Sequence, residues 1–253
     1  MNNPPVIPDI SAVIPGLTGD PIWLESIDST NSEALRRLPE LPSGTVLAAR
    51  EQTAGRGQRG NTWFTEPGKN LTFSIVLKPS GLEAGEAHLL NYLASVAVAE
   101  FLEGYGVSCC IKWPNDIYAG RKKICGILVE NSLSGGCVGA SVIGIGININ
   151  QTEFPQLANA TSLSLVTGLE YVLEDCLKAF VAVFDSWLPR LSTLSEAYVS
   201  RLFQKGVQAR YADYLRGDQF TGTIRGVTSD GRLVIHDGLA ERLYRFKEVG
   251  YIL

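Results

Sequence analysis

The alternation of apolar and polar positions predicts a chain in which strands and helices are interspersed. Residues 70–78 alternate between apolar and polar side chains, which is typical of a strand with one face toward solvent. Residues 85–105 are apolar on nearly every side, which indicates a helix packed deep against a sheet. Apolar runs bounded by turn residues predict further strands over residues 45–51, 108–113, 124–130 and 138–147, with turn chemistry at Asn115-Asp116 and at Ser134-Gly135-Gly136.

Two further helical regions are indicated by residues near their boundaries. Thr30 and Glu33 have the spacing of a capping box, which predicts a short helix toward Leu38. Residues 169–203 predict a helical stretch that is interrupted at Pro189, because proline removes a helical hydrogen bond.

The two ends of the chain differ from its middle. Residues 1–20 hold four of the 12 prolines, which predicts an extended arm. After Gly206, short apolar segments alternate with tight turns, which predicts a small barrel of about five strands. The turns lie at Arg216-Gly217-Asp218, Ser229-Asp230-Gly231 and Asp237-Gly238. We therefore expect an α+β protein with a catalytic-sized domain over residues 1–205 and a small C-terminal β-barrel over residues 206–253.

Composition excludes several classes of protein. The apolar share is 45% and the mean hydropathy is +0.08, which is enough to bury a large core and excludes global disorder. The apolar stretch over residues 92–102 is interrupted by Ser95 and Glu100, so we expect no membrane span. The formal net charge is −4 and the pI is about 5.3, which argues against a general nucleic-acid-binding surface.

Cysteine and histidine usage narrows the chemistry further. The five cysteines include no C-x-x-C motif, which favours reduced thiols in the cytoplasm over a disulfide framework. The N-terminal sequence MNNPPVIPDI lacks the features of a secretory signal. With two histidines in the chain, most zinc sites and a histidine-based triad are improbable, and we expect no protein-held metal.

A glycine-rich loop over residues 53–69 contains G-x-G-x-x-G at Gly55–Gly60. A dinucleotide fingerprint must open a helix, whereas Pro67 and Gly68 follow here and a predicted strand comes next. The downstream kinase motifs and a Walker A sequence are also absent. The loop carries three residues suited to contacting a phosphorylated ligand, namely Arg56, Arg59 and Trp63.

Two segments of this acidic chain are basic. Residues 50–78 hold five lysines and arginines against two glutamates, and residues 112–123 hold four against one aspartate. Guanidinium and ammonium groups match phosphate oxygens, so these segments suggest an anion site. Charge alone favours the simpler interpretation, which is two solvated surface loops.

The motifs of the second basic segment carry a resemblance to a known family. They read Lys112-Trp-Pro-Asn-Asp116, then Lys123-Ile-Cys-Gly-Ile-Leu-Val-Glu130, then Gly144-Ile-Gly-Ile-Asn148, after Ser29-Thr-Asn31 and Gln52-Thr-Ala-Gly-Arg-Gly57 upstream. In this order and spacing they closely resemble the biotin–protein ligases over residues 24–150, and more loosely in the C-terminal part.

The resemblance implies a mixed-sheet core akin to class II aminoacyl-tRNA synthetases, followed by an SH3-like domain. It implies the ligase-only type, since the chain has no room for a winged-helix domain before Trp23. The implied chemistry uses ATP with Mg²⁺ to activate biotin as biotinyl-5′-AMP, and then transfers biotin to a lysine of a biotin carboxyl carrier protein domain. No nucleic-acid or membrane partner is implied, and a homodimer remains open.

The resemblance also implies roles for residues at the matching positions. The biotin-binding positions are Ser29, Thr30, Asn31, Gln52, Arg56, Gly57, Gln58, Lys123 and Gly126; the ATP- and adenylate-binding positions are Arg56, Arg59, Trp63, Asn115, Lys123 and Asn148; the catalytic positions are Arg56, Lys123, Lys112 and Asp116. Several have simpler interpretations, since Ser29-Thr30 also suits a helix cap, and both Asn115-Asp116 and Asn148 suit turns or bulges.

One position departs from the family pattern, because Gln58 stands where many members carry an arginine that helps to hold the adenylate. Gln58 brings no charge, and Arg59 is a candidate to compensate. Two other functions stay open from the residues. A lipoate–protein ligase shares the adenylate chemistry but lacks K-W-P-N-D in this setting, and a non-enzymatic binding module is the alternative from another class. In the C-terminal part, Arg232 and Arg245 are weak candidates for contacts with nucleotide or acceptor.

Overall fold

The computed structural model describes residues 14–155, 157 and 159–252. Most of the predicted N-terminal arm over residues 1–20 therefore lies outside the described residues. Where the chain is described, Ile14 is buried and the Leu17 N–H donates to Asp185 Oδ1 at 2.9 Å. This segment thus packs against the helical layer.

The larger part of the molecule is built on a seven-stranded mixed sheet with the order β1-β2-β3-β7-β6-β5-β4. Its strands are β1 (Ile22–Ile27), β2 (Val46–Gln52), β3 (Leu71–Leu77), β4 (Cys109–Lys112), β5 (Asp116–Ala119), β6 (Lys122–Ser134) and β7 (Cys137–Ile147). The β1–β2 pair is parallel and the other pairs are antiparallel.

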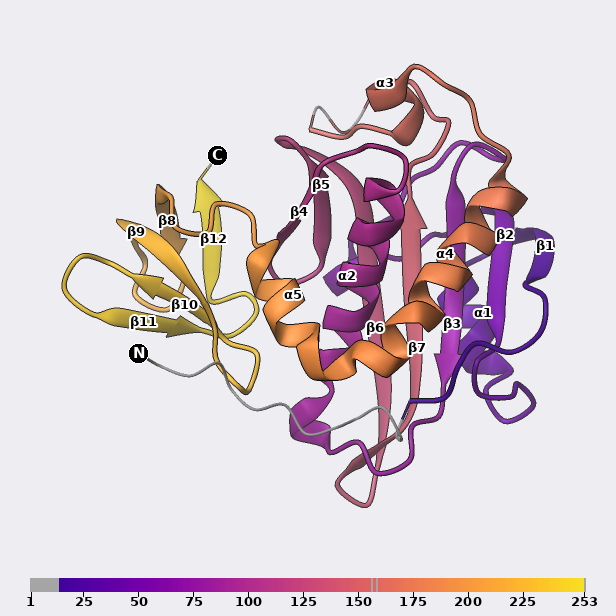
Figure 1. Cartoon of the computed structure of the whole chain (residues 1–253), viewed down its shortest axis with the longest axis horizontal. Helices are drawn as coiled ribbons and strands as arrows, with labels where there is room; N and C mark the ends of the chain where they lie inside the picture. Colours follow the sequence, from indigo (N-terminus) through magenta and orange to yellow (C-terminus); the bar gives the residue numbers. More distant parts are fainter. Residues whose placement is uncertain (1–13, 156, 158, 253) are drawn as a thin grey trace.

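Helices cover the two faces of this sheet unequally (Figure 1). The larger core lies under α2 (His88–Glu103) and α4 (Leu173–Trp187), which pack against alternate strand residues such as Phe73 and Ile145. A second, small cluster joins α1 (Thr30–Arg36) to residues of the opposite parity, such as Val142. Because successive side chains of a strand point to opposite faces, α1 lies on the other side of the sheet from α2.

Shorter elements connect these layers. They are the 3₁₀ turns η1 (Gln58–Gly60), η2 (Ala84–Glu86) and η3 (Leu188–Thr193), and the helices α3 (Leu163–Thr167) and α5 (Leu194–Ser200). As predicted, the last helical stretch is interrupted at Pro189, where α4 gives way to η3.

The C-terminal part is a five-stranded antiparallel sheet with the order β11-β10-β9-β8-β12. Its strands are β8 (Gln208–Asp213), β9 (Asp218–Val227), β10 (Leu233–His236), β11 (Glu241–Tyr244) and β12 (Val249–Ile252). Tyr211, Ile224 and Ile235 are fully buried within it. The predicted change to short strands after Gly206 is confirmed, as is the α+β class.

The sequence-based predictions missed three elements and differ from the structure at three further features. β1, β5 and α3 were not predicted, and β6 extends well beyond the expected residues 124–130. Asp116 begins β5 instead of lying in a turn, because the turn occupies residues 113–115. The capping box is wrong as well. Ser29 is the N-cap of α1 without a side-chain cap, and Glu33 pairs with Arg36 at 2.7 Å instead of reaching back.

No helix in the described part of the chain is long and apolar enough to cross a membrane.

Candidate active site

A cavity of about 550 Å³ opens on the face of the sheet that carries α1. It lies where α1, the glycine-rich loop, the strands β5–β7 and the C-terminal sheet meet. Most of the residues singled out in the sequence line it: Ser29, Thr30, Asn31, Gln52, Arg56, Gly57, Gln58, Trp63, Lys112, Asn115, Asp116, Lys123 and Gly126. The fold therefore gathers motifs that are up to about a hundred residues apart into one hollow.

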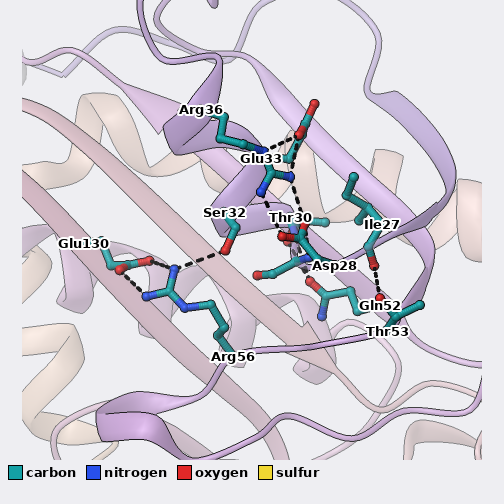
Figure 2. A network of polar contacts seen from close by, with 11 residues as sticks. Ile27, Asp28, Thr30, Ser32, Glu33, Arg36, Gln52, Thr53, Arg56 and Glu130 are labelled. Atoms are coloured by element: carbon teal, nitrogen blue, oxygen red, sulfur yellow. Dashed lines mark hydrogen bonds and ion pairs between the residues drawn. The ribbon is translucent and has the colours of Figure 1, made fainter.

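One end of the cavity is lined by uncharged polar side chains at the start of α1 and by Gln52, and Figure 2 shows Thr30 and Gln52 of this group close to the charged pair Asp28 and Arg36. The backbone N–H of Thr30 donates to Gln52 Oε1 at 2.8 Å, and the Thr30 hydroxyl donates to the same oxygen at 3.1 Å. These two bonds occupy the Gln52 oxygen and fix the orientation of its amide. Neither Gln52 Nε2 nor the Ser29 hydroxyl has a hydrogen-bond partner among the described residues, so both are available to a ligand.

Asn31 is held entirely by the protein. Its Nδ2 donates to Leu128 O at 3.3 Å and to Glu130 Oε2 at 2.9 Å, while its Oδ1 accepts from the Ser74 hydroxyl at 2.6 Å. Asn31 therefore lines the cavity with both of its N–H donors and one acceptor position of its oxygen already used.

Two glycines of β7 make room for these side chains. A Cβ on Gly144 would lie 2.2 Å from Asn31 Oδ1, and one on Gly146 would lie 2.4 Å from Trp63 Cε2. A Cβ on Gly126 of β6 would lie 3.0 Å from the same ring. The glycine-flanked strand therefore has a steric purpose, since it lets side chains lie directly on the sheet.

Trp63 covers this glycine surface at the end of the glycine-rich loop. Its backbone N–H donates to Gly55 O at 2.9 Å, and the Gly57 N–H donates to Asn61 O at 2.7 Å, so the loop folds back on itself. The Trp63 Nε1 and Gln58 Oε1 are buried without a partner among the described residues. The side chain of Arg59 lies outside the described part of the structure.

The other end of the cavity is charged, and two of its cations are paired. Both terminal nitrogens of Arg56 bind the Glu130 carboxylate, at 2.7 and 3.1 Å. Lys123 Nζ lies 2.6 Å from Asp116 Oδ1 and 5.5 Å from the centre of the Trp63 ring. The neighbouring Arg121 and Lys122 are exposed, as predicted.

Lys112 lies at the base of the charged end. Its Nζ is 3.3 Å from the Tyr118 hydroxyl and 5.2 Å from the centres of both the Tyr118 and Tyr251 rings. Burial lowers the pKa of Lys112 below its usual value, and the charge of Asp116 opposes this shift. Asp116 pairs with Lys123 and not with Lys112, so a direct orienting contact from Lys112 to Asp116 is not formed.

Comparison with known proteins identifies relatives of this chain. Residues 23–148 match the Biotin/lipoate A/B protein ligase family. The chain is 31% identical over 244 residues to the biotin–[acetyl-CoA-carboxylase] ligase of Paracoccus denitrificans, covering 89% of this chain and 98% of that protein. This chain belongs to the biotin–protein ligase family.

Other members of the biotin–protein ligase family support the fold. The Aquifex aeolicus biotin protein ligase in complex with biotin and ATP matches with a TM-score of 0.75 at 27% identity, covering 92% of this chain and 98% of that one. The bifunctional ligase/repressor BirA of Escherichia coli (strain K12) is 42% identical over 129 residues, which is 50% of this chain and 39% of that protein. This second similarity is thus confined to part of each chain.

Asn148 is one of the ATP- and adenylate-binding positions that the ligase resemblance implies. It does not line the cavity, and its Nδ2 donates to Thr161 O at 2.9 Å. Its backbone N–H donates to Ile124 O, so it joins β7 to the segment beside Lys123. Asn115 lines the cavity, but its Nδ2 donates to Ile127 O and holds the β4–β5 turn against β6.

The two arginines suggested in the C-terminal part of this ligase-family chain do not line the cavity either. Arg232 pairs with Asp230 at 2.8 Å, and the backbone of Arg245 bonds the side chain of Glu248. The cavity is lined instead by other C-terminal residues, namely Tyr214, Phe246, Lys247, Val249, Gly250 and Tyr251.

Sequence reasoning missed three side chains that build the site: Ser74, Glu130 and Tyr251. Glu130 ends a quoted motif, so its position was visible but its partner was not. Ser74 alternates with apolar residues on β3, which is a weak signal of its place on the α1 face. Tyr251 gave no signal in the sequence, because its contact with Lys112 joins β12 of the C-terminal sheet to β4 of the seven-stranded sheet.

No group of three or more His, Cys, Asp or Glu side chains that could hold a metal ion occurs within the described residues.

Proposed function

We propose that this chain is a biotin–protein ligase that activates biotin with ATP as biotinyl-5′-AMP and then transfers it to a lysine of an acceptor protein. The observation that carries the proposal is one cavity with an uncharged hydrogen-bonding end and a cationic end. The first end has Ser29, Thr30 and Gln52, and the second has Arg56 and Lys123. This combination suits an acid with a polar, uncharged ring edge and a carboxylate tail.

In this assignment the ureido edge of biotin meets the free Gln52 amide nitrogen and the Ser29 hydroxyl, with Thr30 fixing Gln52. We assign Asn31 to shaping the pocket, since both of its N–H donors are used within the protein. Gly57, Gln58 and Gly126 supply loop and strand backbone beside the ligand. Apolar pockets with a few fixed polar groups bind such molecules well.

The first step joins two anions. A biotin carboxylate oxygen attacks the α-phosphorus of ATP, the bond to the β-phosphate bridge breaks, and pyrophosphate leaves. We assign Arg56 and Lys123 to offset the charge that builds as these anions meet, which lowers the barrier most strongly in the transition state. Trp63 and Asn115 belong to the nucleotide side in this assignment, as does Arg59. ATP would bring its own Mg²⁺, and we assign no protein ligand to the ion.

The second step needs a neutral amine. At pH 7 about one lysine in 2,500 is neutral, because the usual pKa is about 10.4. We assign Asp116 to receive the incoming amine and accept its proton, while the amine nitrogen attacks the biotinyl carbon and AMP leaves. Lys112 supports the phosphate side. Asp116 has Lys123 as its partner, so the pair links the groups assigned to the two steps.

We further propose that the acceptor is the biotin carboxyl carrier domain of a carboxylase, since the Paracoccus relative is named a biotin–[acetyl-CoA-carboxylase] ligase. We divide the chain at residues 205 and 206, between the seven-stranded and the five-stranded sheets, and propose an SH3-like C-terminal domain. The thiols described as free agree with a cytoplasmic enzyme.

The test offers biotin and lipoate separately with ATP and detects pyrophosphate, AMP and the acyl-adenylate. We expect biotin to give biotinyl-5′-AMP and lipoate to give none. Adenylate from lipoate alone would favour a lipoate ligase. Binding of either acid without pyrophosphate release would favour the non-enzymatic module. A carboxyl carrier domain and the same domain with its acceptor lysine changed to arginine then test the transfer.

A further inference from the structure

Glu130 pairs with Arg56, the arginine that lines the cavity. It is on β6, its side chain is 26% exposed, and it does not line the cavity, whereas Arg56 does. Its two oxygens receive Arg56 Nη2 at 2.7 Å and Nη1 at 3.1 Å, a two-point contact that defines the plane of the guanidinium (Figure 2).

This contact leaves a defined part of Arg56 unused. A guanidinium carries five N–H donors in a rigid fork. Glu130 takes one donor from each terminal nitrogen, and Ser32 Oγ lies 3.4 Å from Nη1. The Nε–H has no partner among the described residues, and Nη2 keeps its second hydrogen. These two parallel donors form the edge that can bind a carboxylate or phosphate in two-point fashion.

Glu130 is also anchored from the opposite side. Asn31 Nδ2 donates to its Oε2 at 2.9 Å, and Asn31 is fixed in turn by Ser74 at 2.6 Å. The Ser74 oxygen lies 2.8 Å from the Thr30 hydroxyl, which bonds Gln52. A series of close polar contacts therefore runs from the uncharged end of the cavity to the arginine, in which the two hydroxyl hydrogens of Thr30 and Ser74 serve two of the three contacts between Gln52 and Asn31 at a time.

We infer that Glu130 is a positioning residue for adenylate formation, because it holds the Arg56 fork so that its Nε–Nη2 edge faces the substrate anions. The inference rests on the proposed function and adds to it a group that touches neither substrate. The same contact ties the glycine-rich loop to β6. Replacing the carboxylate would leave Arg56 in place and charged but free to rotate.

The first experiment compares wild-type protein with Glu130→Gln, which keeps the size of the side chain and removes its charge. We expect kcat for biotin-dependent ATP–pyrophosphate exchange to fall about tenfold, as for the loss of one hydrogen bond to a charged group. The Kd for biotinol, which lacks the carboxylate, should change by less than about twofold, within the scatter of independent sites. An unchanged kcat, or an equal loss of biotinol binding, would overturn the inference.

The second experiment asks whether Glu130 acts through Arg56. Arg56→Lys keeps the charge but removes the fork. In that background Glu130→Gln should change kcat by less than about twofold, because the group to be positioned is gone. A further tenfold loss would show that Glu130 acts independently of Arg56, and would overturn the inference.

Glu174→Gln is the matched control, because Glu174 also pairs with an arginine, Arg50, but away from the cavity. Glu174→Gln should leave kcat and biotinol binding unchanged. Thermal unfolding of each variant establishes that the variant is folded. A wild-type protein without biotin-dependent exchange would refute the proposed function itself, whereas exchange with additive mutational effects would refute this inference alone.

Discussion

At the scale of single residues, each of the two cations assigned to the anions already has a carboxylate partner. Arg56 binds Glu130, and Lys123 binds Asp116. The two pairings leave different capacities for binding a substrate anion. A guanidinium that is paired on one edge still has a second edge with free N–H donors, whereas an ammonium is a compact point charge that is shared among its neighbours. Lys123 must therefore divide its attraction between Asp116 and a bound anion.

Arg56→Ala should lower kcat for adenylate formation by about 10²–10³, the usual cost of removing one donor from a developing charge. Biotin affinity should fall much less, because the uncharged end around Gln52 remains intact. Calorimetry with biotin and single-turnover formation of biotinyl-5′-AMP separate the two effects. Lost biotin affinity with intact turnover at saturating biotin would contradict the role assigned to Arg56.

Lys123→Ala should also block the first step, by about 10²-fold, whereas Lys122→Ala should be nearly silent. The two lysines are adjacent on β6, but Lys123 lines the cavity and Lys122 is exposed. The rate of pyrophosphate exchange is measured for both variants, which form a matched pair because each loses one positive charge. Equal losses would reduce the effect to bulk charge.

At the scale of elements, the site depends on how closely the glycine-rich loop approaches β6 and β7. Trp63 rests on Gly126 and Gly146; a Cβ at Gly146 would clash with the ring, and one at Gly126 would be crowded by it. The loop is thus shaped by the strands it covers as much as by its own glycines.

Gly146→Ala should displace Trp63, because the new Cβ would lie 2.4 Å from its ring. We expect the KM for ATP to rise about tenfold through the loss of one aromatic contact, with little change in unfolding temperature. Gly139→Ala is the control on the same strand, since its Cβ would meet only ordinary contacts at 3.4 Å and beyond. An unchanged KM for ATP in Gly146→Ala would show that Trp63 does not serve the nucleotide.

At the scale of the whole molecule, the C-terminal sheet completes the cavity instead of standing apart. Tyr251 on β12 and Tyr118 on β5 enclose the Lys112 ammonium from two sides. The Trp113 indole N–H donates to Gly231 O at 3.3 Å, a second contact between the two parts. The C-terminal part therefore helps to fix the charged end of the site.

Tyr251→Leu should lower kcat/KM for ATP about fivefold, because it removes one of the two rings facing the Lys112 ammonium. Tyr251→Phe keeps the ring and should retain activity close to wild type. Steady-state exchange at varied ATP measures both, with urea unfolding as the check on stability. A similar loss in Tyr251→Phe and Tyr251→Leu would contradict the ring contact as the cause.

The sequence by itself determined the α+β class and the family, and 13 of the residues that it singled out line the cavity. It could do so because strand alternation is a local property and the motifs lie at fixed spacings along the chain. Lys123 and Lys122 were distinguished by position alone. The glycine pattern around Gly144 and Gly146 was visible too, although not the side chains it accommodates.

Tertiary structure decided which groups face each other. Asn148 matched a family position but turns to Thr161, and Asp116 begins a strand and pairs with Lys123. Glu130 and Tyr251 joined the site without being predicted. The reason is physical: whether two side chains meet depends on strand register, sheet order and the packing of distant segments, and none of these can be read from the local pattern around either residue.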